Sequence, residues 1–382
     1  MKTPSKIDFF LPHSSQYGVL HHFTKKMFEA FQKRGFVCRL FKADDHLATL
    51  NEPPDFTLGY NGAPQHASGI LLCDLIERPH ICCLVDLAYR YQYLTESSYI
   101  HMGCNDLFSE RMFREQGFSQ AFFLPVAGDT DQIIPVEQYR SMDLVLMATF
   151  IDYEGRRSTW SEHFDQPMVN VLNQAVELIF AGESLALIEA FQLSYNDALK
   201  RGEELYIHPQ IIQSALESLE LYVRGRDRAD LVRAITQLPI HIYEGSIDSL
   251  GWKEYLNKQS NIIYHPPVSF EESLKVFSKA KIVLNSSPHT RHGASERVFN
   301  ALARGAVPLT NYNDYMSSVF AAEKEILFFE NKHLDLLEPL LEKYLDDNVL
   351  RNAIAKAGQK KVLQHHGWDN RVDLLINYLD KI

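Results

Sequence analysis

The sequence predicts an α/β protein of two domains, each built around a parallel sheet, with a helical insertion in the second domain. Short apolar runs bounded by Gly, Pro, Asn or Asp alternate with amphipathic stretches along most of the 382 residues. Such runs are typical of strands that are buried on both faces of a parallel sheet. Between residues 160 and 238 the alternation gives way to long amphipathic stretches, which predict helices. A chain of this length supplies about two domains of common size.

Residues 1–135 are predicted to form the N-terminal domain. The run KIDFFLP is the first strand candidate, and the stretch after it repeats apolar residues at helical spacing until Gly35, a typical helix stop. These apolar residues are Phe23, Met27, Ala30 and Phe31. The later strand candidates of this domain are FVCRLFKA, DFTLGYNG, HICCLVD, YIHMGCN and QAFFLPVAG.

Residues 136–365 are predicted to form the C-terminal domain. Its first strand candidate is SMDLVLMATF, and the helical insertion at about 160–238 follows. The alternation of strands and helices then resumes, and the chain ends in helices. The strand candidates after the insertion are PIHIYEG, NIIYHPPV, AKIVLNSS, AVPLTNY and EILFFE.

The composition excludes several classes of protein. A hydrophobic fraction of 46% and a charged fraction of 23% are those of an ordinary globular protein. The formal net charge of −11 argues against binding to nucleic acid or to an anionic membrane, but it leaves room for one local basic pocket. No apolar run reaches the ~18 residues that a membrane span requires, although peripheral membrane contact stays open.

The five cysteines and the N-terminus indicate a cytoplasmic protein. No two cysteines form a C-x-x-C pair, and several lie in apolar, strand-like runs, so we expect buried free thiols in a reducing compartment, with metal or disulfide roles as the alternative. The first residues carry too short an apolar run for a signal peptide. The cysteines are Cys38, Cys73, Cys82, Cys83 and Cys104.

The stretch SSPHTRHGASERVFNALARG follows the apolar run AKIVLN and predicts an anion site. Ligands collect where a strand of an open α/β sheet leads into a helix. Ser295 is a candidate N-cap, and the free amides of the first helical turn attract anions. Arg291 and Arg297 supply guanidinium groups that suit phosphate, and His289 and His292 add hydrogen-bond donors. The alternative is a capped helix with ordinary surface charges.

The segment ERVFNALARGAVPLTN resembles the helix-and-strand signature of GT-B glycosyltransferases, especially the group related to the spore-maturation protein CgeB. Four further segments are similar to that group in the expected order, so that the likeness covers residues 124–155 and 262–375. They are LPVAGD, MDLVLMATFIDYEGRR, VSFEESLKVFSKAKIVLNSS and AIAKAGQKKVLQHHGWDNRVDLL. The resemblance implies two Rossmann-like domains that face each other across a cleft, with a last helix over 366–382 returning to the N-terminal domain.

By this resemblance the chain is expected to bind a nucleotide sugar with a UDP, GDP or dTDP carrier. The diphosphate would lie at the helix that begins at Glu296, without a metal, because helix amides and arginines can neutralise its charge. Gly18 would approach the ligand from the N-terminal domain, and Thr149 and Arg156 from the first strand of the C-terminal domain. The other expected binding residues are Asn285, His289, Arg291, His292, Gly293, Ser295, Glu296, Arg297 and Asn300.

The chain departs from the family pattern at two positions. Many retaining members carry two glutamates eight residues apart, and an ungapped alignment places His292 and Asn300 there. Glu296 replaces one of them only if the helix register differs. An inverting transferase instead needs a base on the acceptor side, for which Asp86 is the first candidate and His13 the second. The alternative for Asp86 is a helix cap or turn residue.

The sequence therefore predicts a metal-independent glycosyltransferase (EC 2.4) whose acceptor is a glycan, a protein or a lipid. A non-catalytic nucleotide-sugar sensor or scaffold is the alternative, because the two glutamates are missing. A nucleotide-sugar epimerase has the same fold but needs more carboxylates near the sugar. The missing Gly-x-Gly-x-x-Gly argues against a dehydrogenase, and the histidines lack the H-x-x-x-H spacing of a metal site.

Overall fold

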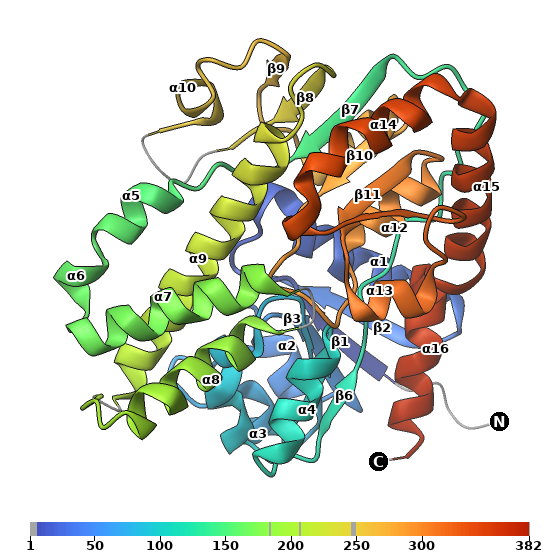
Figure 1. Cartoon of the computed structure of the whole chain (residues 1–382). Coiled ribbons are helices and arrows are strands. Elements are labelled where there is room, and N and C mark those ends of the chain that lie inside the picture. The colour runs from blue at the N-terminus through green and yellow to red at the C-terminus, as the bar shows by residue number, and fades with distance from the viewer. Residues whose placement is uncertain (1–5, 183–184, 206–207, 246–249, 382) are drawn as a thin grey trace. The chain divides into compact units, whose positions relative to one another are not determined.

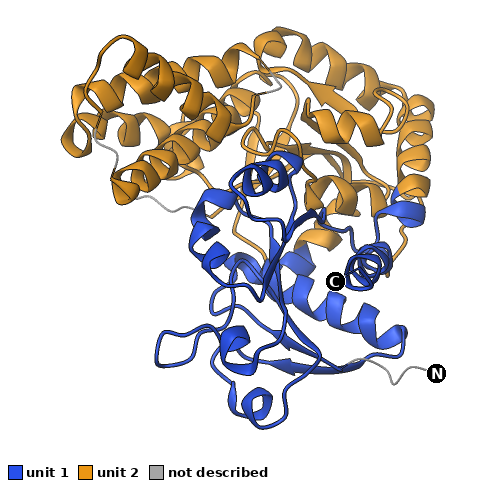
Figure 2. Ribbon diagram, turned by 90° about the horizontal axis from the view of Figure 1, so that it is seen from below, with its two compact units in different colours: residues 1–130, 269–272, 362–382 blue, residues 131–268, 273–361 orange. Residues whose placement is uncertain are grey.

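The computed structural model describes residues 6–182, 185–205, 208–245 and 250–381 (Figure 1). The chain divides into two compact units, which Figure 2 colours separately. Unit 1 contains residues 1–130, 269–272 and 362–382, and unit 2 contains residues 131–268 and 273–361. Helix α16 (Trp368–Leu379) therefore belongs with the N-terminal part of the chain.

Unit 1 is built on a six-stranded parallel sheet in the order β2-β1-β3-β4-β5-β6. Strands β3, β4 and β5 are buried along their whole length, as expected of strands covered on both faces. The strands are β1 (Lys6–Phe10), β2 (Val37–Phe41), β3 (Phe56–Tyr60), β4 (His80–Leu84), β5 (Ile100–Cys104) and β6 (Ala121–Phe123).

The helices of unit 1 include α1 (Val19–Lys33), whose buried face confirms the helical pattern predicted for this segment. Gly35 follows its end with φ 85°, a left-handed conformation that glycine adopts without strain. Helix α16 packs on α1: the ring of Trp368 lies 5.1 Å from that of Phe23, and Arg34 pairs with Asp373 at 2.6 Å. The other helices are η1 (Gln16–Gly18), α2 (Leu47–Asn51), α3 (Leu72–Ile76), η2 (Ala88–Glu96) and α4 (Leu107–Glu115), where η marks a 3-10 helix.

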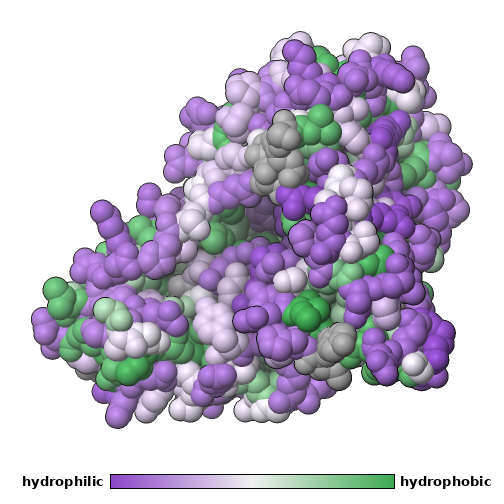
Figure 3. Space-filling view, turned by 90° about the vertical axis from the view of Figure 1, so that its left-hand side faces the viewer, coloured by the Kyte–Doolittle hydropathy of each residue, from purple (hydrophilic) through white to green (hydrophobic). Residues whose placement is uncertain are grey.

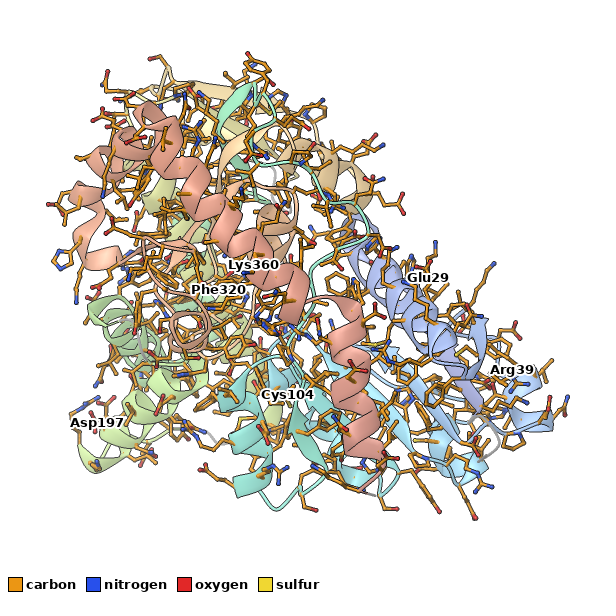
Figure 4. All side chains as sticks on the ribbon, turned by 90° about the vertical axis from the view of Figure 1, so that its right-hand side faces the viewer. Glu29, Arg39, Cys104, Asp197, Phe320 and Lys360 are labelled. Carbon is orange, nitrogen blue, oxygen red and sulfur yellow. The ribbon has the colours of Figure 1, made fainter. Side chains whose placement is uncertain are left out.

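All five cysteines belong to unit 1 and are free thiols, four of them buried and Cys38 half-buried. Cys104, for example, ends β5 in the interior (Figure 4). Burial raises the pKa of Cys73 to about 11 and that of Cys82 to about 12. The expectation of buried free thiols is therefore confirmed for four of the five, and burial disfavours the thiolate, which is the reactive form.

Unit 2 is built on a second six-stranded parallel sheet, in the order β12-β11-β10-β7-β8-β9. Its central strands β7, β10 and β11 end next to one another, so the loops that follow them gather at one edge of the sheet. The strands are β7 (Met142–Met147), β8 (Ile240–Tyr243), β9 (Ile262–His265), β10 (Ala280–Asn285), β11 (Val307–Asn311) and β12 (Leu327–Phe329).

The helices of unit 2 cover this sheet and form the block predicted as an insertion. Helix α5 (Tyr153–Ser158) precedes the block, which contains α6 (Trp160–His163), α7 (Gln166–Ala181), α8 (Leu187–Lys200) and α9 (Pro209–Arg233). The remaining helices are α10 (Trp252–Tyr255), α11 (Phe270–Phe277), α12 (Glu296–Ala303), α13 (Asp314–Val319), η3 (Asn331–Leu336), α14 (Leu337–Asp346) and α15 (Asn348–His365); α11 and α15 each cross from one unit to the other.

Helix α9 belongs to both the helical block and the sheet. Its first half packs on α7 and α8, with Leu216 and Leu219 buried. Its second half places Leu231 and Val232 in the same core cluster as Leu144 of β7. The block predicted for about 160–238 therefore reaches the sheet through the last turns of α9, whose apolar residues cover the sheet just before β8. Figure 3 looks onto the side where α5, α6 and α7 lie in Figure 1 and shows mostly hydrophilic residues, with hydrophobic ones in small groups.

Gly225 lies where α9 comes closest to the segment after β7. A Cβ atom added there would lie 2.8 Å from Cβ of Tyr153 and 2.9 Å from the carbonyl oxygen of Ile151. Gly225→Ala is therefore expected to lower the free energy of unfolding by about 1–3 kcal/mol, because the helix has to move away. Urea unfolding measures this effect. The control Gly182→Ala places its Cβ within 4 Å of no atom, and equal stability of the two variants would contradict the close packing of α9.

Candidate active site

Asn285, the last residue of β10, organises the polar end of the unit 2 sheet. It is 1% exposed, and its side-chain oxygen accepts hydrogen bonds from the Ser295 hydroxyl at 3.3 Å and from Arg297 Nη1 at 3.4 Å. Its amide nitrogen donates to Thr310 Oγ1 at 2.8 Å and to Ser287 Oγ at 3.2 Å. One buried amide thus fixes the start of α12, the Arg297 guanidinium and the turn after β10.

Ser295 is the N-cap residue of α12, as predicted, but its side chain does not cap the helix. Its hydroxyl is engaged with Asn285, so it does not satisfy the amides of the first turn. Glu296 Oε1 lies 3.8 Å from Arg297 Nε, and both side chains are half-buried. Asn300, one turn further on, is 1% exposed. The helix therefore begins with amides that its own N-cap leaves for other acceptors.

The loop between β10 and α12 is tied to the segment that follows β11. Arg291 is 1% exposed, and its Nη1 donates to the Tyr312 carbonyl at 3.4 Å. His292 Nδ1 lies 3.3 Å from Asp314 Oδ2, and the Asn313 amide donates to the carbonyl of Gly293 at 3.1 Å. Arg291 was predicted as a phosphate ligand. Its burial and its contact with a backbone carbonyl give it a part in holding the loop.

Asp227 of α9 joins the helical block to the ends of β10 and β11. This carboxylate is 1% exposed and accepts three hydrogen bonds. Ser286 Oγ donates at 2.5 Å, the Asn311 amide at 2.8 Å and the Asn331 amide at 2.5 Å. The side-chain oxygen of Asn311 in turn accepts the Ser287 backbone N–H at 2.8 Å. The turn after β10 is therefore held by a residue of α9.

Two arginines of α9 lie beside the predicted site and were missed by the sequence analysis. Arg228 is 3% exposed, and its Nη1 donates to the Thr149 carbonyl at 2.7 Å. Burial lowers its pKa, and the charges of Arg224 and Arg297 lower it further. Positive charge from two helices, α9 and α12, therefore gathers here. The available signal was the spacing of Glu220, Arg224 and Arg228, one turn apart on a single helix face.

His289 lies within this group of positive charges. Burial, followed by the charges of Arg224, Arg228 and Arg297, lowers its pKa to about 3, although Glu220 acts in the opposite direction. The imidazole is therefore neutral at physiological pH, with one N–H donor and one acceptor nitrogen.

Thr149 and Arg156 follow β7, as predicted. The Thr149 carbonyl receives the Arg228 guanidinium, which brings this position to the cluster. Arg156 lies on α5, the short helix that packs against α9. The structure thus gathers Thr149, Asn285, His289, Ser295 and Arg297 at one edge of the unit 2 sheet.

In unit 1, Asp86 is an exposed carboxylate whose hydrogen-bond partners include Asn61 and Tyr91. It lies just after β4, and its Oδ2 accepts the Asn61 amide at 2.8 Å and the Tyr91 hydroxyl at 3.4 Å. The Asn61 side-chain oxygen accepts the backbone N–H of Val85 at 2.9 Å. Asn61, just after β3, has a φ of 52°, a left-handed conformation that asparagine adopts more readily than most other residues.

His80 supports the loop that carries Asn61. It is fully buried on β4, and burial lowers its pKa to about 4, so the ring is neutral. The Gly62 carbonyl, 3.1 Å from Nε2, can only accept a hydrogen bond, so Nε2 carries the proton. Nδ1 then accepts from the Thr57 hydroxyl at 2.7 Å. A fixed tautomer thus holds the Asn61–Gly62 turn.

The other predicted residues of unit 1 are less constrained. His13 Nε2 lies 3.4 Å from Asp44 Oδ1, and both side chains are exposed. Gly18 has a φ of 79°, and a Cβ there would meet no atom within 4 Å. Backbone conformation therefore explains this glycine; the predicted approach to a ligand remains a prediction.

Two general properties bear on the chemistry of the site. Across the residues described, no group of three His, Cys, Asp or Glu side chains is arranged to hold a metal ion. Of the helices in the described part of the chain, none is both long and apolar enough to cross a membrane.

Comparison with known proteins gives a family match for part of the chain. Residues 226–377 match the family model described as glycosyl transferase-like. The matched range begins within α9 and includes β8 to β12 with the loop and helix around Asn285. No curated protein matches the sequence.

Solved structures give the fold. HepE from Anabaena, in complex with UDP and glucose, is similar over 99% of this chain and 100% of its own, with 9% identity and a TM-score of 0.58. Sucrose-phosphate synthase from Thermosynechococcus elongatus is similar over 99% and 98%, with 11% identity and a TM-score of 0.56. The chain spans 54% of the length of TarM, with a TM-score of 0.44. The chain therefore has the GT-B fold of two Rossmann-like units, and its residues 226–377 resemble glycosyl transferases.

Proposed function

We propose that the protein is a glycosyltransferase that moves a sugar from a nucleotide-sugar donor to an acceptor. One observation carries this proposal: the guanidinium groups of Arg228 and Arg297, a neutral histidine and the start of a helix lie together at the carboxyl edge of the unit 2 sheet, within the range that resembles glycosyl transferases. This is the edge at which open α/β sheets bind ligands. HepE, of the same fold, is described in complex with UDP and glucose, which supports a nucleotide sugar as substrate.

The diphosphate of the nucleotide sugar is proposed to bind at Arg297 and the first turn of α12, without a metal ion. Arg297 is half-buried, and its hydrogen bond to Asn285 orients its guanidinium group. A guanidinium group can donate two hydrogen bonds at once to two oxygens of a phosphate. Helix amides add partial positive charge at the same place. Together these groups can neutralise the charge that develops on the leaving diphosphate as the sugar departs.

Asp86 is proposed to act as the base that takes the acceptor proton. Its contacts with Asn61 and Tyr91 restrict its orientation, and its exposure leaves it accessible to an acceptor. The absence of glutamates at His292 and Asn300 favours an inverting reaction, in which the acceptor oxygen attacks as the diphosphate leaves. His13 remains the second candidate for the base, and Glu296 the candidate on the donor side.

Because of the motif likeness we propose that the protein belongs to the CgeB-related group, and we propose a cytoplasmic location. Free thiols and a nucleotide-sugar substrate both fit a reducing cytoplasm. The acceptor is proposed to be a glycan, a protein or a lipid.

A panel of UDP-, GDP- and dTDP-sugars tests the proposal. A transferase is expected to release free nucleotide slowly as it transfers sugar to water, and chelation of metal ions should not change the rate. Binding without release would favour a nucleotide-sugar sensor, which the missing glutamates make the main alternative. An isomerised nucleotide sugar would indicate an epimerase. Binding of no nucleotide by the folded protein would overturn the proposal.

Arg297→Ala is expected to weaken nucleotide binding by about 1.5–3 kcal/mol, because it removes a charge-assisted contact with phosphate. Isothermal titration with UDP, GDP and dTDP measures the loss. The control Lys281→Ala removes one positive charge near the other end of β10, where Lys281 pairs with Asp143 at 2.6 Å, and should leave affinity unchanged. Equal affinities of the two variants would remove Arg297 from the site.

A further inference from the structure

We infer that helix α9 supplies a second part of the anion site, in which Arg224 and the loop residue His289 bind the diphosphate of the nucleotide sugar together with Arg297, while the buried Arg228 holds α9 at the edge of the sheet. This inference rests on the proposed function and assigns part of the substrate site to the helical block. The sequence analysis predicted this block as a helical insertion and assigned it no role.

The first step is the position of α9. Asp227 hydrogen-bonds to Ser286, directly after β10, and Arg228 donates to the Thr149 carbonyl, just after β7. These two contacts fix the turns of α9 from about 224 to 228 at the carboxyl edge of the sheet. Gly225 allows the close approach, since a Cβ there would lie 2.8 Å from Cβ of Tyr153.

The second step is the direction of the side chains. Residues 224 and 228 are one turn apart and share a face of the helix. Both of their charges act on His289, as does that of Arg297 from α12, so all three guanidinium groups lie near the histidine. These guanidinium groups come from two different helices and lie near one loop residue, an arrangement that is typical of a binding site.

The third step concerns buried side-chain nitrogens of Arg224 and His289 that have no hydrogen-bond partner among the residues described. Within the described part of the chain, Arg224 Nε and His289 Nδ1 are both buried from solvent and have no hydrogen-bond partner. Arg224 Nη1 donates to Glu220 Oε1 at 2.9 Å, which orients the guanidinium. Buried polar atoms normally have partners, so these two atoms keep hydrogen-bonding capacity that a ligand can use.

The fourth step is the balance of charge. Three guanidinium groups act on His289 against a single carboxylate, Glu220. Asp227, the other nearby acid, already accepts three uncharged donors. An anion with several oxygens suits this site, and the two phosphates of a nucleoside diphosphate can contact both helices at once. His289, whose pKa is about 3, would take part as a neutral group.

The variant that tests the inference is Arg224→Gln. Glutamine can still donate a hydrogen bond to the buried Glu220, so the fold is kept while the guanidinium is lost. We expect the affinities for UDP and for inorganic pyrophosphate to fall by about 10- to 100-fold in isothermal titrations. The matched control is Arg226→Gln on the same helix, where Arg226 pairs with Asp230 at 3.4 Å and lies over the Phe180 ring. Its affinities should equal those of the wild type, and thermal melting verifies that both variants are folded.

The outcomes separate this inference from the proposed function. If wild type binds pyrophosphate and UDP and Arg224→Gln binds both as tightly as Arg226→Gln does, the role of α9 is wrong and the proposed function stands. If Arg224→Gln weakens the binding of pyrophosphate, but wild type binds UDP, GDP and dTDP no more tightly than it binds pyrophosphate, the anion site stands and the nucleotide-sugar proposal fails. If folded wild type binds neither probe, both are wrong.

Discussion

Replacing Asp86 with asparagine is expected to slow sugar transfer by about 10²- to 10⁴-fold, the usual contribution of a general base. Asparagine has the same size, and its side-chain oxygen can still accept the hydrogen bonds from Asn61 and Tyr91. It cannot take a proton from the acceptor. The affinity for nucleotide should not change, because the residues proposed to bind it belong to unit 2. Nucleotide release from the preferred nucleotide sugar measures the rate, and titration measures the affinity.

The pH dependence of this variant separates a base from a residue of merely structural importance. Activity of the wild type should fall on the acid side as the base becomes protonated, and this limb should be missing from the residual activity of Asp86→Asn. His13→Asn is the matched control, since His13 is the other candidate and its contact with Asp44 is exposed. If His13→Asn loses activity and Asp86→Asn keeps it, the base is His13.

The fold was predictable because the signal is local. Each strand of both sheets is a short apolar run bounded by turn residues, and β3, β4 and β5 are buried throughout, as continuous apolar runs indicate. The start of α12 was predictable for the same reason, because strand, polar loop and helix follow each other within some twenty residues of sequence.

The contribution of α9 was not predictable, because it depends on contacts between distant parts of the chain. The Asp227–Ser286 hydrogen bond joins residues 59 apart, and the Asp227–Asn311 bond joins residues 84 apart. The sequence around Asp227 is that of an amphipathic, charged helix, which alone indicates a solvated face. In the structure, Leu231 and Val232 pack with the sheet, and Asp227 and Arg228 of the same helix bond to the loops.

Residue type also says little about the direction of a side chain. Arg291 and Arg297 were predicted together as phosphate ligands, yet Arg291 is 1% exposed and donates to the Tyr312 carbonyl, whereas Arg297 is half-buried next to Asn285. For Asn61 the local conformation was predictable and the contact was not. Its Asn–Gly pair predicts a turn, but its hydrogen bond to Asp86, 25 residues away, exists because β3 and β4 pair in parallel.

Asp227→Ala is expected to lower the free energy of unfolding by about 3–5 kcal/mol, because it removes a buried acceptor and leaves three donors without it. Ser286 and Asn311 are themselves nearly fully buried, so water cannot easily replace the carboxylate. Asp227→Ala is also expected to weaken nucleotide binding under conditions in which the protein remains folded. The turn after β10 would no longer be held to α9, and the groups proposed to bind the diphosphate would separate. Urea unfolding and titration with UDP at low temperature measure the two effects.

Asp230→Ala on the same helix is the matched control for this prediction. Asp230 is about a third exposed, and its contact with Arg226 is 3.4 Å long, so its removal should cost less than about 1 kcal/mol. Asp227→Asn adds a finer test, because the amide keeps the shape and one acceptor oxygen but places a new donor among the donors of Asn311 and Asn331. Its stability should lie between those of wild type and Asp227→Ala. If Asp227→Ala is no less stable than Asp230→Ala, the carboxylate does not hold α9 to the sheet, and the assignment of Arg224 to the site loses its structural basis.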